Sequence, residues 1–223
     1  MCPQTSANIL RLWPESFGMA KKPRHWIFLR GLSREVAHWQ DFIDLFEQTF
    51  KDDRVFGIDL PGAGSRLKEE APLTVEATAM SVRKKAMMEA EGPYYLFAVS
   101  MGAMVATEWA RAFPGEIGGL VLLNSSFTNF SKFHDRLRWE AWPEFLSIFL
   151  NGDSLSREKM ILDFTSNNKS EHDRLATKWQ QIHQKRPIKR PAALKQIIAA
   201  TRYKAPLKRP LDNILLLRSL GDR

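Results

Sequence analysis

The chain has 223 residues and a formal net charge of +8 at pH 7. Hydrophobic residues make up 44% of it and charged residues 26%, which predicts a globular protein with a sizeable core and excludes a disordered chain. No apolar run approaches the roughly 20 residues of a membrane span, and the N-terminus lacks the pattern of a secretory signal. The single cysteine, Cys2, excludes an internal disulfide, so we expect a cytoplasmic protein.

The positive charge is concentrated in one segment. Residues 185–209 hold nine Lys and Arg residues and no acid, so subtracting +9 from +8 leaves the rest of the chain at −1. Such a segment usually forms a solvated face, but it is also a candidate docking patch for an anionic partner. No nucleic-acid-binding motif accompanies the charge, so a nucleic-acid partner is not expected.

The first part of the chain alternates between strand and helix patterns. Apolar runs bounded by Gly and Pro turns predict strands at 26–29, 55–60, 94–99 and 119–124. Between them, helical spacing predicts one helix capped by Ser33 and ending at Phe50, one that opens at Thr74, and one that runs from Gly102 to Pro114.

Crossovers this short imply a parallel sheet with right-handed connections, so the fold class is α/β with a mostly parallel, doubly wound sheet. The sites of such sheets lie at the carboxyl ends of the strands. Three loops should meet there: residues 30–32, 59–65 and 99–102.

The second part of the chain changes character. Residues 127–205 show no strand pattern, and helical spacing near 133–149, 156–164, 171–184 and 191–201 predicts a helical cap inserted over the sheet. A last apolar run at 213–218 predicts a fifth strand. The domain assignment is therefore a core in residues 1–126, a cap in 127–205, and the final strand and turn in 206–223.

Ser100 lies where a buried strand gives way to a helix. A serine on such a sharp turn exposes its hydroxyl at the end of the sheet, and the N-terminus of the helix behind it offers a backbone N–H to a developing oxyanion. The turn requires small residues two positions before and after the serine, and Ala98 and Gly102 meet that requirement. A serine that merely caps a helix is the alternative interpretation.

Together these features resemble the α/β-hydrolase superfamily with a helical cap. The resemblance covers roughly residues 25–223 and rests on five features in order. They are Phe28-Leu29-Arg30-Gly31-Leu32, the helix with Trp39, Asp59-Leu60-Pro61-Gly62-Ala63-Gly64, Val99-Ser100-Met101-Gly102, and Gly221-Asp222.

The resemblance implies roles for individual residues. Ser100 would be the nucleophile, the backbone N–H groups of Leu32 and Met101 would form the oxyanion hole, and Asp222 would be the acid that orients a histidine. Arg30 stands where the family usually has histidine, which places a long cation near the entrance of the site. We therefore name Arg30 a candidate substrate-binding residue.

Trp142 and Phe145, in the predicted cap, are further candidates for an apolar acyl pocket.

The family's base histidine lies on a loop beyond the Asp222 position, and this sequence has none there. A structural or surface role is the expectation for all five histidines, which are His25, His38, His134, His172 and His183. The simplest interpretation is a chain cut short at its C-terminus, lacking the family's last strand and closing helix. The fifth strand would then form an exposed edge of the sheet.

The expected function is hydrolysis of a carboxylic ester or thioester of a small apolar acyl compound, through an acyl-enzyme on Ser100. The alternatives are a non-catalytic binding protein or inactive fragment on the same fold, and an acyltransferase or lyase of the same superfamily. No cofactor is expected, because the sequence contains neither a Cys/His metal-ligand spacing nor a glycine-rich phosphate loop.

Overall fold

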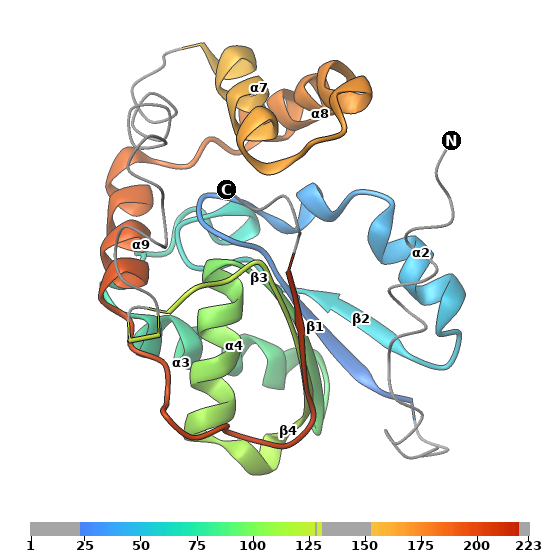
Figure 1. The fold of residues 1–223 in the computed structure, drawn as a ribbon, viewed down its shortest axis with the longest axis vertical. Helices are drawn as coiled ribbons and strands as arrows, with labels where there is room; N and C mark the ends of the chain where they lie inside the picture. The colour runs from blue at the N-terminus through green and yellow to red at the C-terminus, as the bar shows by residue number, and fades with distance from the viewer. Residues whose placement is uncertain (1–22, 128, 131–152, 219–223) are drawn as a thin grey trace.

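The computed structural model describes residues 23–127, 129–130 and 153–218 (Figure 1). Its centre is a five-stranded, all-parallel sheet with the order β2-β1-β3-β4-β5. The strands are β1 (His25–Leu29), β2 (Arg54–Gly57), β3 (Tyr94–Val99), β4 (Ile117–Leu123) and β5 (Ile214–Leu217). This confirms the predicted α/β class and the parallel sheet.

Helices connect and cover the strands. The α-helices are α2 (Phe42–Thr49), α3 (Val75–Glu89), α4 (Met101–Ala112), α7 (Ser154–Thr165), α8 (His172–Lys185) and α9 (Arg190–Arg202). Short 3₁₀ segments are η1 (Val36–Trp39), η2 (Gly64–Arg66), η3 (Pro114–Glu116) and η5 (Lys169–Glu171). The Thr74 side chain accepts a hydrogen bond from the Ala77 N–H, which confirms the predicted start of α3.

The sheet has a separate hydrophobic core on each face because successive residues of a strand point to opposite sides. In β1, Ile27 and Leu29 face α3 and α4, while Trp26 and Phe28 face η1 and α2. The second core is mainly aromatic; its buried members are Trp26, Phe28, Trp39, Phe46, Phe97 and Val121. Because both faces of the sheet are covered, the strand sequences are continuously apolar and do not alternate between apolar and polar residues.

The segment after β1 differs from the prediction of one helix capped by Ser33. It is broken into η1 and α2 at Gln40, whose φ is 50°. Ser33 itself has a φ of 56°, and Glu35 is the N-cap of η1. The prediction of one continuous helix was therefore wrong. Two contacts hold η1 in place: the Val36 N–H donates to Asp59, and the Trp39 side chain packs into the aromatic core.

β2 is shorter than predicted. It ends at Gly57 instead of Leu60, and just beyond it the Asp59 carboxylate binds the Val36 and Ser65 N–H groups. The backbone also approaches η1 closely there, since a Cβ on Gly57 would lie 2.3 Å from a methyl carbon of Val36. α7 also begins earlier than predicted, with Asp153 rather than Ser156 as its N-cap. The helix predicted near 133–149 lies outside the described residues.

The remaining helices divide into two groups. Figure 1 shows α7 and α8 beyond the carboxyl ends of the strands, whereas α9 lies alongside the sheet layer. Ala199 of α9 and Tyr203 just after it belong to the same core as α3 and α4. α9 is therefore part of the support of the sheet as well as the chain's exit from the predicted cap.

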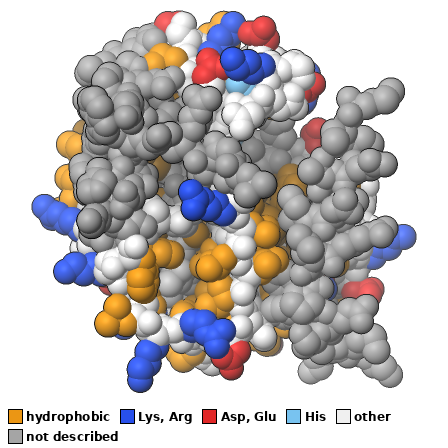
Figure 2. Space-filling view, viewed as in Figure 1, with side chains coloured by type: hydrophobic (Ala, Val, Ile, Leu, Met, Phe, Trp, Pro, Cys, Tyr) orange, Lys and Arg blue, Asp and Glu red, His pale blue; other side chains and the backbone are white. Residues whose placement is uncertain are grey.

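β5 forms one edge of the sheet in the described part of the chain. Figure 2 shows hydrophobic side chains gathered on the face that carries β5 and α4 in Figure 1. The side chain of Leu216 in β5 is 69% exposed. An exposed apolar edge strand agrees with the expectation for residues 213–218.

Candidate active site

The candidate site lies where the winding of the sheet reverses. The chain passes from β1 to β2 on one side and then returns to β3 on the other side of β1. The chain therefore leaves the neighbouring strands β1 and β3 toward opposite edges of the sheet. In α/β sheets a crevice for ligands opens between two loops that separate in this way. Gly31 follows the first of these strands and Ser100 follows the second.

Ser100 has an unusual backbone conformation, with φ 54° and ψ −118°. A non-glycine residue with positive φ is strained by about 1–3 kcal/mol and persists only when its surroundings fix it. Here the Ser100 N–H donates to the Leu123 carbonyl at 3.0 Å, and the Ser100 carbonyl accepts from the Ala103 N–H at 3.0 Å and from the Ser125 hydroxyl at 3.0 Å. The turn is thus tied to β4, to α4 and to the loop after β4.

Two glycines allow the turn to pack against the end of β1. A Cβ on Gly102 would lie 2.6 Å from the Arg30 carbonyl oxygen and 2.8 Å from that of Leu29. A Cβ on Gly31 would lie 3.0 Å from the Ser100 Cβ. The loop after β1 therefore touches the Ser100 turn directly, which is the contact that the sequence motif predicts.

The two proposed oxyanion donors are not used elsewhere. Met101 is the first residue of α4, so its N–H has no partner within the helix. Among the described residues, neither the Met101 N–H nor the Leu32 N–H makes a hydrogen bond. Both groups belong to the loops that meet at Ser100.

Asp59 fixes the loops after β1 and β2 to each other. Its carboxylate accepts from the Val36 N–H at 2.6 Å, the Ser65 N–H at 2.7 Å and the Ser65 hydroxyl at 2.8 Å. Gly64, with φ 53°, passes so close that a Cβ there would lie 2.2 Å from an Asp59 oxygen. An aspartate at the end of an apolar run, directly before a Leu-Pro-Gly-x-Gly turn, is a sequence signal for this role.

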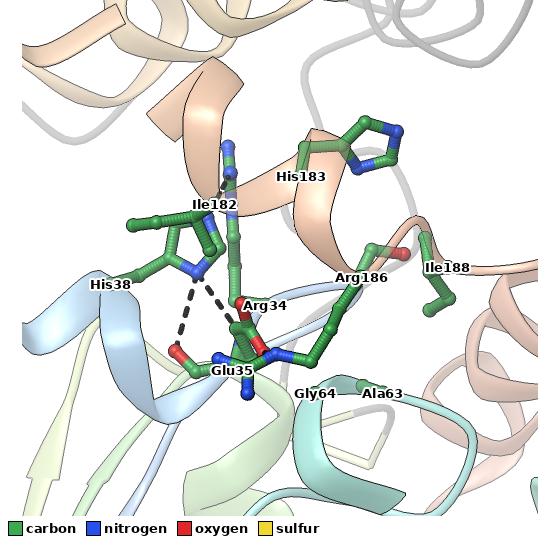
Figure 3. A pocket seen from close by; sticks show the side chains of 10 residues that line it. Arg34, Glu35, His38, Ala63, Gly64, Ile182, His183, Arg186 and Ile188 are labelled. Atoms are coloured by element: carbon green, nitrogen blue, oxygen red, sulfur yellow. Dashed lines mark hydrogen bonds and ion pairs between the residues drawn. The ribbon is translucent and has the colours of Figure 1, made fainter. Parts of the chain in front are cut away.

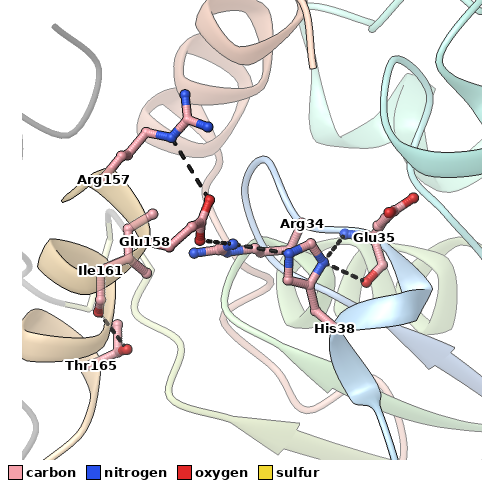
Figure 4. Close-up of polar contacts among 7 residues, drawn as sticks. All are labelled: Arg34, Glu35, His38, Arg157, Glu158, Ile161 and Thr165. Carbon is pink, nitrogen blue, oxygen red and sulfur yellow. Dashed lines mark hydrogen bonds and ion pairs between the residues drawn. The ribbon is translucent and has the colours of Figure 1, made fainter. Parts of the chain in front are cut away.

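A buried polar network joins the loop after β1 to α7 (Figure 4). Arg34 Nη1 donates to Glu158 of α7 at 2.6 Å and also to His38 Nε2 at 3.0 Å. His38 Nδ1 lies 3.2 Å from both the carbonyl oxygen and the backbone nitrogen of Glu35. Because Arg34 can only donate to Nε2, the ring proton belongs on Nδ1 and is donated to the Glu35 carbonyl. Burial, followed by the charges of Arg34 and Arg30, lowers the pKa of His38 to about 2, so this imidazole is neutral.

A small pocket lies beside this network, between α8 and the loops after β1 and β2 (Figure 3). Its polar lining includes Arg34, Glu35, His38, His183 and Arg186. Arg186 Nε lies 2.7 Å from a Glu35 carboxylate oxygen, yet burial dominates and raises the pKa of Glu35.

Replacing Glu158 with glutamine is expected to lower the free energy of unfolding by about 3 kcal/mol. The change leaves the buried Arg34 guanidinium without its counter-charge, and breaking one side of a buried ion pair costs about 3–5 kcal/mol. Urea denaturation measures the effect. Glu171→Gln, which removes the acid of the exposed Arg174 pair, is the matched control and should change stability by less than about 0.5 kcal/mol. Equal effects of the two changes would contradict this account.

The remaining candidate residues and the histidines lie either outside the described residues or without a hydrogen bond to Ser100. Asp222, Trp142, Phe145 and His134 lie outside the described residues. His172 faces Asp163 at 2.9 Å, and His25 faces the Glu91 carbonyl at the opposite end of the sheet. None of the four described histidines is hydrogen-bonded to Ser100.

The network of Arg34 and Glu158 was not predicted from the sequence. The two residues are 124 positions apart, and no local pattern connects them.

Three cations of the basic segment 185–209 have acidic neighbours among the described residues. Arg186 pairs with Glu35, Lys195 with Glu70, and Arg209 lies 3.5 Å from Asp212. The role of residues 185–209 as a docking patch stays a prediction.

No helix in the described ranges has both the length and the apolar character to cross a membrane. Over the same residues, no three His, Cys, Asp or Glu side chains are grouped so that they could hold a metal ion.

Comparison with known proteins identifies the family. A family model described as the α/β-hydrolase fold matches residues 25–188, which is most of the chain. The chain belongs to the α/β-hydrolase fold family. No curated protein sequence matched it.

Solved structures of this family share the fold at low sequence identity. The RedJ thioesterase of the prodiginine pathway in Streptomyces coelicolor is 18% identical, with a TM-score of 0.56 over 89% of this chain and 77% of that one. The putative non-heme bromoperoxidase BpoC of Mycobacterium tuberculosis is 17% identical, with a TM-score of 0.62 over 89% and 84%. The type II thioesterase BorB of the borrelidin cluster is 20% identical, with a TM-score of 0.58 over 91% and 75%.

Proposed function

We propose that this α/β-hydrolase-fold protein hydrolyses a carboxylic ester or thioester through an acyl-enzyme on Ser100. The observation that carries the proposal is the strained Ser100 turn at the N-terminus of α4, packed against Gly31 at the point where the sheet reverses. A structural serine gains nothing from a positive φ, whereas a nucleophile gains an exposed hydroxyl beside two oxyanion donors.

The chemistry follows from this arrangement. The Ser100 oxygen attacks the substrate carbonyl, and the negative charge that develops on the carbonyl oxygen is received by the Leu32 and Met101 N–H groups. Collapse expels the alcohol or thiol and leaves an acyl group on Ser100, which water then removes. Both half-reactions need a base: it takes the proton of the Ser100 hydroxyl and returns it to the leaving alcohol or thiol, and it then takes a proton from the attacking water. We propose Asp222 as the acid that would orient this base.

Within this proposal a thioester is the favoured substrate, with a thiol as the leaving group. Two of the structural neighbours, RedJ and BorB, are thioesterases. Their resemblance to this chain is one of fold, so it supports the choice of substrate to test first. A medium-chain acyl thioester and the matching oxygen ester would be compared as substrates.

Covalent labelling tests the proposal without a known substrate. A fluorophosphonate probe phosphonylates an activated serine and ignores an ordinary surface hydroxyl. We expect labelling of one residue, located to the peptide that contains Ser100 by mass spectrometry and abolished by Ser100→Ala. Labelling elsewhere with Ser100 unmodified, in a protein shown to be folded by circular dichroism, would argue for a non-catalytic role of the fold.

A further inference from the structure

Three arginines lie at the boundary between the core and α7, and two of them contact one carboxylate, that of Glu158. Arg34 Nη1 lies 2.6 Å from Glu158, and Arg157 Nε lies 3.8 Å from the same side chain (Figure 4). Arg30 has no acidic partner among the described residues. One buried guanidinium nitrogen of each arginine lacks a hydrogen-bond partner within the described chain: Nε of Arg30, Nη2 of Arg34 and Nη2 of Arg157.

The three cations are close enough to repel one another. The charge of Arg34 adds to burial in lowering the pKa of Arg30 to about 10, and the charge of Arg157 acts in the same direction on the pKa of Arg34. Burying several positive charges together costs free energy unless an anion pairs with them. Among the described residues, Glu158 is the acid that contacts Arg34 and Arg157, and it leaves one buried nitrogen of each of the three arginines without a hydrogen-bond partner.

The orientation of the guanidinium groups restricts the shape of the anion that can pair with them. Arg30 lies over the ring of Trp39 at 4.8 Å, and Arg34 lies over the ring of Trp179 at 4.6 Å. An aromatic ring thus covers one face of each group, and the unused N–H bonds point along the edges. Edge-on N–H pairs match the two oxygens of a planar carboxylate.

The cluster is adjacent to the Ser100 turn. The Arg30 carbonyl lies 2.6 Å from the position that a Cβ of Gly102 would occupy, and the next residue, Gly31, packs against Ser100 itself. The Arg30 side chain therefore starts from backbone that touches the nucleophile turn and extends toward Trp39. The loop that carries Arg30 is therefore the same loop that packs against the Ser100 turn.

We propose that Arg30 and Arg34, with Arg157 beside them, form a subsite for a carboxylate carried by the substrate of Ser100. The inference rests on the proposed function and narrows it from esters or thioesters in general to those that bear a second, anionic group. Glu158 holds Arg34 in place, and Arg30 is the residue left to pair with the ligand.

Binding to the full chain carrying Ser100→Ala tests the subsite without turnover. The probes are monomethyl adipate and its neutral isostere, methyl 6-amino-6-oxohexanoate, measured by isothermal titration calorimetry. We expect the carboxylate to bind at least tenfold more tightly than the carboxamide, because charge-assisted hydrogen bonds are about twice as strong as neutral ones. Equal affinity of the two probes would overturn the proposal.

Arginine variants locate the effect. Arg30→Gln should abolish the preference for the carboxylate, and Arg157→Gln should reduce it. Arg54→Gln removes the same charge at the amino end of β2 and should preserve the preference. A preference that survives Arg30→Gln would overturn the proposal, and so would its loss in Arg54→Gln, because only general electrostatics would then explain it.

Thermal unfolding separates a ligand-binding role of Arg30 from a structural one. Among the described residues Arg30 has no acid partner to lose, only its contact with the Trp39 ring. Arg30→Gln should therefore lower the unfolding temperature much less than Glu158→Gln does, whereas an arginine held by a buried ion pair would lower it as much. The two proposals also fail differently. Turnover of p-nitrophenyl hexanoate that requires Ser100, with no preference for the carboxylate probe, refutes the subsite alone. An Arg30-dependent preference in a protein whose turnover ignores Ser100 refutes the proposed function alone.

Discussion

Replacing Ser100 with alanine is expected to lower kcat/KM for p-nitrophenyl hexanoate by at least about 10³-fold, because removal of a serine nucleophile leaves only the residual rate due to binding and oxyanion stabilisation. Alanine keeps the Cβ and hence the strained backbone of the turn, so the free energy of unfolding should stay within about 0.5 kcal/mol of the wild-type value. Initial rates at several substrate concentrations, with urea denaturation alongside, measure both quantities.

Two further substitutions sharpen this result. Ser156→Ala removes an exposed hydroxyl on α7 and should leave the rate unchanged. Ser100→Gly should be as inactive as Ser100→Ala but more stable, by about 1 kcal/mol or more, because glycine tolerates a φ of 54°. Full activity of Ser100→Ala would contradict the assignment of the nucleophile. Equal stability of the alanine and glycine variants would contradict the strain at the turn.

A methyl group at Gly102 should be among the most damaging single changes in the chain. The Cβ of Gly102→Ala would lie within 3.0 Å of three backbone atoms of Leu29 and Arg30, and backbone cannot move aside as a flexible side chain can. We expect a loss of about 3 kcal/mol of unfolding free energy, at the upper end of what overpacking costs. The separation of the turn from the end of β1 should also cut turnover by at least about tenfold.

Gly115→Ala provides the control for that change. Gly115 lies in η3, and no atom lies within 4 Å of the position that its Cβ would take. The same added methyl group should therefore change stability by less than about 0.5 kcal/mol. Urea denaturation of the two variants under identical conditions gives the comparison. If Gly102→Ala were as stable as Gly115→Ala, the close contact between β1 and the Ser100 turn would not exist in solution.

The sheet and its helices could be predicted from the sequence because their signals are local. A strand covered on both faces must be apolar throughout, as Ile27 and Phe28 illustrate by joining opposite cores. Ser100 and Gly102 were identifiable for the same reason, since a sharp turn between a strand and a helix restricts the size of residues within two positions of it.

Features that depend on long-range contacts could not be predicted in this way. The apolar spacing between Val36 and Phe50 is helical, yet Asp59, more than 20 residues later, binds the Val36 N–H, and the segment breaks at Gln40. Likewise, the pairing of Arg34 with Glu158 depends on where the tertiary fold places α7. Arg30 drew attention only because it departs from a family pattern, and its isolation from every described acid required the structure.

The Asp59 carboxylate has a consequence for the energetics of the reaction. By binding the Val36 and Ser65 N–H groups it holds the loop after β1 in place before any substrate arrives. The conformational entropy of ordering that loop, and with it the Leu32 N–H, is therefore lost during folding rather than at each turnover. An oxyanion donor that is preorganised in this way stabilises developing charge without a reorganisation step. In the reaction proposed above, the Asp59 carboxylate would thereby lower the activation barrier without touching a reacting atom.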